Sequence, residues 1–211
     1  MIRDKSQIFC DMDGVLVDFE TAAIALLNNL FNGGQLPGVK RSKSHFALLE
    51  RVKDKLGKDY NIRSNKCLSD PIIRSFMFAS IGANPGHIFA SMPKYEDGVN
   101  ELWPFLNSTG HIVNLLTAPI LARKGAPTTA ADGKRRWAKE NLTPQPENII
   151  VTPAKQKAAH AVYNGVPNIL IDDKQSTVSS WNEAGGIGIL HISKNSKKSI
   201  DQLTNILMKN V

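Results

Sequence analysis

The sequence predicts an α/β protein, in which helices cover both faces of a parallel sheet and a small helical segment is inserted after the first strand. Apolar runs of strand length alternate with helix-like patterns over residues 94–211, and continuous apolar runs are typical of parallel strands buried on both faces. Two runs, ending at Cys10 and Ile171, are each followed by acidic residues. Residues 19–93 contain no further strand-like run, which indicates a helical insertion.

The first strand, around Ile8–Cys10, precedes a helix from Phe19 to Phe31, whose apolar residues recur at helical spacing and which ends at Asn32-Gly33-Gly34. Two more helices are expected in the insertion, at residues 45–56 and 70–81, the second with a proline in its first turn. The chain therefore divides into a core, residues 1–18 and 94–211, and a helical cap, residues 19–93, which we expect to lie over the acidic strand.

The rest of the chain alternates between helix and strand. After a helix at 95–106, strands are expected at 111–117, 148–151, 168–171 and 187–191. Further helices are expected at 130–142, 155–164, 175–184 and 199–208, with glycines after the second and third of these. This order predicts crossover connections between parallel strands.

The composition is that of a globular protein with one domain, or with a core and a small insert: 211 residues, 42% of them hydrophobic. No apolar run approaches the about 18 residues that a membrane span needs. The N-terminus enters the first strand without a signal-peptide pattern, so we expect a cytoplasmic protein. Cys10 and Cys67 are too few for a disulfide framework. The net charge of +7 favours anionic partners, either phosphorylated small molecules or nucleic acid.

The first strand runs directly into Asp11, Asp13 and Gly14. In an extended segment Asp11 and Asp13 point to the same side, and adjacent carboxylates repel each other unless a cation or a shared proton lies between them. Asp-Gly pairs are also common in ordinary turns. However, a second acidic pair, Asp172-Asp173, ends another apolar run. The two pairs together predict one metal site at one edge of the sheet.

Polar groups follow four predicted strands at their carboxyl ends, where parallel α/β sheets bind ligands. They are Asp11 and Asp13, Thr117, Thr152 with Lys155, and Asp172 with Asp173. Carboxylates suit Mg²⁺, while a hydroxyl and an ammonium can neutralise charge on a phosphoryl group. The set predicts phosphoryl transfer, with Asp11 as nucleophile and Asp13 as general acid and then general base.

Four motifs resemble those of the haloacid dehalogenase (HAD) superfamily, in the same order. They are Asp-Met-Asp-Gly-Val-Leu-Val-Asp at 11–18, Leu-Leu-Thr at 115–117, Lys155, and Ile-Asp-Asp at 171–173. The resemblance implies a Rossmann-like core with a helical cap, Mg²⁺ as cofactor, and hydrolysis through an aspartyl-phosphate. It implies that Thr117 and Lys155 bind phosphate. The metal ligands would be Asp11, the backbone carbonyl of Asp13, and Asp172 and Asp173.

Within that superfamily the chain is most similar to the 5'(3')-deoxyribonucleotidases. The similarity lies in the first motif up to Phe19, in Thr117-Ala118-Pro119, and in a basic helix with Lys134 and Trp137. It implies hydrolysis of (deoxy)nucleoside monophosphates, with Phe19, Ala118 and Lys134 among the substrate-binding residues. Ala118 stands where the relatives usually have serine, which removes one phosphate donor.

The lysine of the third motif has an alternative. The segment between Lys155 and Asp172 is longer than in the animal enzymes, so Lys157 also fits the motif. Residues two apart on a helix face different directions, so we expect only one of the two lysines to reach the site.

Three functions remain open. The first is a nucleotidase whose partner is a nucleoside monophosphate. The second is a phosphatase for polynucleotide 3'-ends, which the basic cluster Lys134-Arg135-Arg136 favours, or for another small metabolite. The third is a degenerate relative that binds a nucleotide without turnover, although the four intact motifs argue against it. No membrane partner is expected, and a homodimer remains open.

Overall fold

The computed structural model describes residues 5–36, 43–56, 62 and 65–209. They form two compact units. The first unit contains residues 1–18, 94–119 and 138–211, and the second contains residues 19–93 and 120–137.

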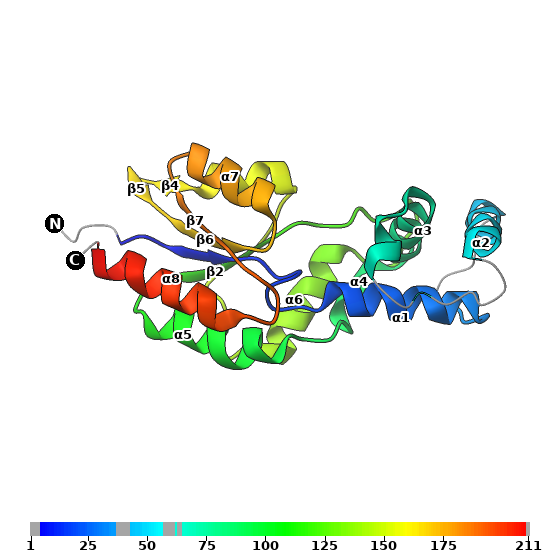
Figure 1. Cartoon of the computed structure of the whole chain (residues 1–211), viewed down its shortest axis with the longest axis horizontal. Helices are drawn as coiled ribbons and strands as arrows, with labels where there is room; N and C mark the ends of the chain where they lie inside the picture. Colours follow the sequence, from blue (N-terminus) through cyan, green and yellow to red (C-terminus); the bar gives the residue numbers. More distant parts are fainter. Residues whose placement is uncertain (1–4, 37–42, 57–61, 63–64, 210–211) are drawn as a thin grey trace. The chain divides into compact units, whose positions relative to one another are not determined.

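The first unit is built on a five-stranded sheet in the order β3-β2-β1-β6-β7, with every neighbouring pair parallel. The strands are β1 (Ile8–Cys10), β2 (Val113–Thr117), β3 (Ile149–Val151), β6 (Ile169–Asp172) and β7 (Ile187–Leu190). The central strand β1 lies between β2 and β6, with Cys10 opposite Leu115 on one side and Ile171 on the other (Figure 1). This arrangement confirms the predicted α/β class with a parallel sheet.

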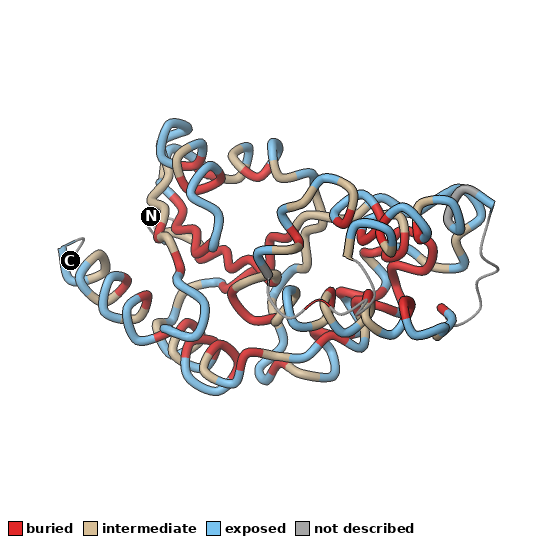
Figure 2. Tube along the Cα trace, turned by 45° about the vertical axis from the view of Figure 1, so that its right-hand side comes forward, coloured by how far each residue is buried: buried red, intermediate tan, exposed pale blue. Residues whose placement is uncertain are grey.

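The sheet is central because its strands are apolar on both faces. All residues of β1, β2 and β6 are buried, and the buried colour follows these strands in Figure 2. On one face Phe9, Leu116 and Leu170 pack with Ala161 and Trp181 into one hydrophobic cluster. Burial of such side chains contributes about 1.5–3 kcal/mol each. The core therefore holds the carboxyl ends of β1 and β6 side by side.

Helices lie on both faces of this sheet (Figure 1). The 3-10 helix η3 (Ala154–His160) and α7 (Gln175–Glu183) lie on one face, and Trp181 of α7 donates a 3.1 Å hydrogen bond to the carbonyl of Asn168. On the other face lie α5 (Trp103–Ser108) and α8 (Ser196–Lys209). The π-helix η2 (Gly98–Leu102) precedes α5. Within the described residues, no helix is long and apolar enough to cross a bilayer.

The predicted helix at 155–164 is wrong in its second half. The chain forms η3 and then a hairpin of β4 (Val162–Tyr163) and β5 (Val166–Pro167). The turn between them is Asn164-Gly165, and both residues have positive φ, 49° and 77°. Asn-Gly between two short apolar pairs is a hairpin signal that helical periodicity obscured.

The second unit is helical. It contains α1 (Phe19–Phe31), α2 (Lys43–Leu56), the 3-10 helix η1 (Asn65–Ser69), α3 (Pro71–Ile81), α4 (Pro85–Ala90) and the start of α6 (Ala130–Asn141). Asp70 caps α3 by accepting hydrogen bonds from the Ile72 and Ile73 N–H groups. The predicted helices at 19–31 and 70–81 are present, whereas η1 and α4 were not predicted.

The second unit also includes residues 120–137, which the sequence analysis placed in the core. The Thr128 hydroxyl donates a 2.7 Å hydrogen bond to the Asn84 side chain. A Cβ atom on Gly133 would lie 2.3 Å from the Gly86 carbonyl oxygen, so α6 approaches the start of α4 closely. These contacts join segments about 45 residues apart, a distance over which local sequence patterns carry no signal.

Candidate active site

The turn after β1 is fixed by its own backbone. The Asp11 N–H donates to the Ile171 carbonyl on β6 at 2.9 Å. The Met12 carbonyl then accepts hydrogen bonds from the N–H groups of Val15, Leu16 and Val17 at 2.9–3.2 Å. Gly14, with φ +83°, donates its N–H to the Val17 carbonyl at 2.9 Å. The backbone therefore turns sharply directly after Asp11.

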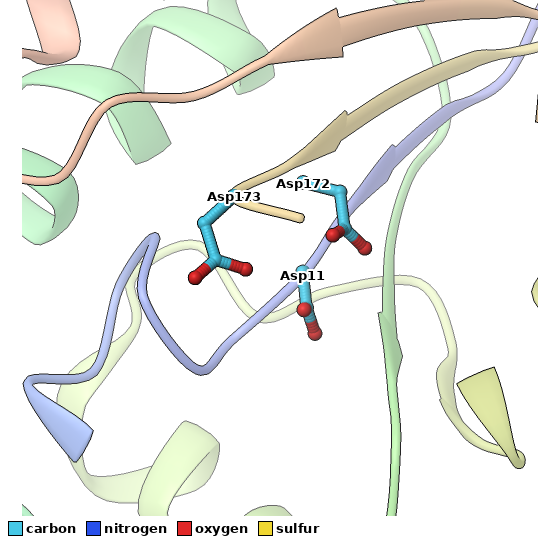
Figure 3. Close-up of side chains that lie close together, drawn as sticks. All are labelled: Asp11, Asp172 and Asp173. Atoms are coloured by element: carbon cyan, nitrogen blue, oxygen red, sulfur yellow. The ribbon is translucent and has the colours of Figure 1, made fainter. Parts of the chain in front are cut away.

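Three carboxylates meet at the carboxyl ends of β1 and β6. One oxygen each from Asp11, Asp172 and Asp173 lies within 4.8 Å of the others (Figure 3). Asp172 is fully buried and Asp11 is 7% exposed, while Asp173 is exposed. The structure thus brings together acids 161 residues apart because parallel strands end at the same edge of the sheet.

Lys157 on η3 joins two of these acids. Its Nζ lies 3.0 Å from Asp11 Oδ2 and 2.7 Å from Asp172 Oδ2, and its side chain is 2% exposed. The Met12 N–H donates to Asp11 Oδ1 at 2.7 Å, and the Lys174 N–H donates to Asp172 Oδ1 at 2.9 Å. Both carboxylates are therefore held in one orientation.

This geometry corrects the choice between the two lysines. Lys155 is exposed, whereas Lys157 contacts the carboxylates. Both lysines lie on η3, where successive residues are about 120° apart, so side chains at positions two apart point in different directions. The sequence predicted that only one of the two lysines would reach the site, and the phase of η3 places Lys157 there.

Loss of solvent and mutual repulsion both raise the pKa values of Asp172 and Asp173. Asp173 is exposed as a residue, but its carboxyl group packs against Gly14, and the loss of water around that group, followed by the charges of Asp11, Asp172 and Asp13, raises the pKa of Asp173 to about 7. Burial and Asp11 also raise the pKa of Asp172, although Lys157 opposes the shift. Burial alone would lower the pKa of Lys157, but Asp11 and Asp172 raise it above its usual value. Added positive charge would stabilise this cluster.

The donor set fits a hard divalent cation. All three clustered ligands are carboxylate oxygens, which Mg²⁺ prefers over nitrogen or sulfur ligands. The cluster does not include the carboxylate of Asp13, whose predicted ligand atom is its backbone carbonyl. Asp11, Asp13, Asp172 and Asp173 would therefore hold the ion through three side chains and one carbonyl.

Gly14 permits this arrangement. A Cβ atom at position 14 would lie 2.1 Å from Asp173 Oδ2, so a larger residue would displace that carboxylate. Its φ of +83° also favours glycine. The glycine in the first motif is thus required both by the turn and by the close approach of Asp173.

Thr117 ends β2 next to β1 and is fully buried. Its carbonyl accepts a 3.0 Å hydrogen bond from the Thr152 N–H. Ala118 follows it and is partly buried. Both residues belong to the first unit, at the edge of the sheet where the acids lie.

Two predicted substrate-binding residues, Phe19 and Lys134, belong to the second unit. Both lie next to Phe89 of α4: the Phe19 and Phe89 ring centroids are 6.4 Å apart, and Lys134 Nζ lies 4.4 Å from the Phe89 centroid. Helix α4, which carries Phe89, was not predicted, although Asn84 before Pro85 is a helix-start signal. Phe76 is fully buried and its ring stacks on that of Phe31, with the centroids 5.8 Å apart, so it belongs to the hydrophobic interior of the second unit.

Comparison with known proteins gives similarity of structure alone. No family model and no curated protein matches the chain. A hydrolase from Streptococcus pneumoniae TIGR4 is 10% identical over 92% of this chain and 97% of that chain, with a TM-score of 0.49. The HAD-type protein YfnB from Bacillus subtilis, bound to magnesium, is 12% identical over 89% of this chain and 87% of that chain, with a TM-score of 0.46.

A defluorinating L-2-haloacid dehalogenase is 10% identical over 92% of this chain and 84% of that chain, with a TM-score of 0.49. These neighbours are described as hydrolases, HAD proteins and dehalogenases. At such identities and TM-scores they assign neither a family nor an activity to this chain.

Proposed function

We propose that the protein is a Mg²⁺-dependent phosphomonoester hydrolase that acts through an aspartyl-phosphate. The observation that carries the proposal is the clustering of Asp11, Asp172 and Asp173 within 4.8 Å, with Lys157 bridging Asp11 and Asp172. A bound Mg²⁺ would supply Lewis-acid polarisation of a phosphate oxygen. A cation held by these carboxylates, together with the buried ammonium of Lys157, would offset the charge of a phosphate dianion.

Each protein group has a role in the proposed reaction. A carboxylate oxygen of Asp11 forms a bond to phosphorus while the bond from phosphorus to the leaving oxygen breaks. Asp13 gives its proton to that leaving oxygen and then takes a proton from the attacking water. Water attack on phosphorus breaks the bond to Asp11 and releases phosphate. Lys157 and Thr117 neutralise the phosphoryl oxygens.

The proposed substrates are (deoxy)nucleoside monophosphates, and this choice rests on the resemblance to the deoxyribonucleotidases. The roles of Phe19, Ala118 and Lys134 in substrate binding rest on the same resemblance. A polynucleotide 3'-end is the second candidate, because the protein has a net charge of +7 and Arg135 and Arg136 are exposed on α6.

The test compares phosphate release from nucleoside monophosphates, sugar phosphates and a 3'-phosphorylated oligonucleotide, each with and without Mg²⁺. Halide release from a 2-haloacid is assayed in parallel. Mononucleotide turnover that needs Mg²⁺ is expected. Faster turnover of the oligonucleotide by orders of magnitude would favour the second candidate, and halide release without phosphate release would overturn the proposal.

The Asp11→Asn variant tests the mechanism. It removes the nucleophilic charge, and we expect phosphate release to fall by at least about 1,000-fold with the fold intact. The matched control is Asp201→Asn, which changes an exposed carboxylate on α8. Equal phosphate release by Asp11→Asn and wild type would contradict the aspartyl-phosphate route.

A further inference from the structure

The loop between β7 and α8 contacts the turn after β1, residues 11–18, which carries Asp11 and Asp13 and is called the acidic turn below. The Ser193 hydroxyl donates a 2.7 Å hydrogen bond to the Gly14 carbonyl, across 179 residues of sequence. The His191 N–H donates to the Asp172 carbonyl at 2.9 Å, and the Ser196 N–H donates to Asp97 Oδ2 at 3.0 Å. The loop is therefore anchored on both sides of Ser193.

The hydrogen bond from Ser193 restricts backbone rotation at Gly14. The Gly14 N–H, which shares a peptide plane with the Asp13 carbonyl, is bonded to the Val17 carbonyl at 2.9 Å. The Gly14 carbonyl lies in the following peptide plane and is held by Ser193. Glycine rotates more easily about its backbone bonds than any other residue. The two hydrogen bonds together fix both planes, and so the direction of the Asp13 carbonyl relative to Asp173.

The loop also keeps a backbone conformation that its sequence disfavours. The Asn195 N–H donates to the Ile192 carbonyl at 3.0 Å, which closes a turn with Ser193 and Lys194 at its centre. Lys194 has φ 63°, in the region that favours glycine or asparagine. Strained residues of this kind persist where the surrounding structure requires them, often near functional sites.

The side chain of Lys194 contributes to the same anchoring. Its Nζ lies 5.8 Å from the centroid of the Tyr95 ring. The Tyr95 N–H donates to the Leu16 carbonyl at 2.8 Å, and its hydroxyl lies 3.3 Å from Asp18 Oδ1. The acidic turn is thus held by the β7–α8 loop at Gly14 and by Tyr95 at Leu16 and Asp18.

We propose that Ser193 is a positioning residue of the acidic turn, acting through Gly14 to orient the Asp13 carbonyl toward the cation that Asp11, Asp172 and Asp173 hold. This inference rests on the proposed function, because it presumes a cation in that cluster. Ser193 acts through the backbone of Gly14. Its hydroxyl sets the geometry of a ligand atom, and groups of this kind tune metal affinity.

The experiment measures Mg²⁺ binding by calorimetry in the full-length protein. Ser193→Thr and Ser193→Val are compared because the two side chains have the same shape and differ in the hydroxyl. We expect Ser193→Val and Ser193→Ala to weaken Mg²⁺ binding by about 10- to 100-fold, and Ser193→Thr to retain it. Ser108→Ala is the matched control, since that exposed hydroxyl also donates a 2.7 Å hydrogen bond to a carbonyl, that of Phe105.

A kinetic readout separates positioning from general destabilisation. In the Ser193→Val variant the Mg²⁺ concentration for half-maximal phosphate release should rise, with kcat at saturating Mg²⁺ close to that of Ser193→Thr. Wild-type Mg²⁺ affinity in Ser193→Val would overturn the positioning role and leave the proposed function standing. Absence of Mg²⁺ binding by the wild type would overturn the proposed metal site, and with it the role of Ser193.

Discussion

Lys157 and Asp172 form a buried ion pair at 2.7 Å that joins η3 to the end of β6. The same ammonium lies 3.0 Å from Asp11, so one lysine links the proposed nucleophile to a proposed metal ligand. The ammonium group of Lys157 thus offsets the negative charge of both carboxylates.

Replacing Lys157 should therefore affect both stability and activity. Lys157→Met leaves Asp11 and Asp172 without their shared cation, and breaking a buried pair in this way costs about 3–5 kcal/mol. We expect phosphate release to fall by about 100- to 1,000-fold, and added Mg²⁺ to raise the melting temperature more in the variant than in the wild type. Thermal melts with and without Mg²⁺, together with steady-state assays, check this.

The matched control is Lys155→Met, which removes an exposed lysine from the same 3-10 helix. It should change stability by at most about 0.5 kcal/mol and leave turnover near the wild-type value. A larger loss of activity in Lys155→Met than in Lys157→Met would restore the original assignment of the motif lysine.

Gly14→Ala should disrupt the site by steric displacement. The new Cβ would meet Asp173 Oδ2 at 2.1 Å, so the carboxylate must move away from the cluster. We expect Mg²⁺ affinity and turnover to fall by at least about tenfold. Gly110→Ala separates this clash from backbone strain, because Gly110 has φ +71° but nothing within 4 Å of a Cβ.

The Gly110 variant should lose about 1–2 kcal/mol of stability through φ alone and keep its Mg²⁺ affinity. Calorimetry and urea unfolding of both variants separate the two effects. Equal Mg²⁺ affinity in Gly14→Ala and Gly110→Ala would show that Asp173 need not stay where the structure places it.

His191 should make the folded state sensitive to acid. Its side chain is 3% exposed, and its Nδ1 lies 2.9 Å from the Ser199 hydroxyl. Burial lowers the pKa of His191, while Asp97 partly offsets the shift. The folded state thus binds this proton less readily than the unfolded state, so its stabilising contribution is present above about pH 6.5 and is lost as the pH falls.

In the His191→Asn variant the amide can still reach Ser199 but does not titrate. We expect the wild type to lose more stability than the variant between about pH 7 and about pH 5. Urea unfolding at both pH values measures the difference, with His87→Asn, on the exposed histidine of α4, as control. A variant that loses as much stability as the wild type would show that other groups cause the acid sensitivity.

Local sequence patterns predicted which acids lie at the carboxyl ends of the strands. Asp11 follows β1 and Asp172 ends β6, and both strands are apolar runs of the kind typical of parallel strands buried on both faces. Their carboxyl ends share an edge of the sheet, so the convergence of Asp11 with Asp172 and Asp173 was predictable, whereas the carboxylate of Asp13 does not join them.

Other features depended on contacts that local periodicity does not encode. The phase of η3 selected Lys157 over Lys155, and the Asn164-Gly165 turn replaced the end of a predicted helix with a hairpin. Residues 120–137 joined the helical unit through contacts with the start of α4.

Apolar periodicity and chain direction were enough to predict the α/β class, the positions of the five parallel strands along the chain, and the acids where two of them end. The tertiary structure alone decided which lysine neutralises Asp11 and which hydroxyl holds Gly14. Those choices depend on helix phase and on a loop 179 residues away, and both are fixed only when the core has packed.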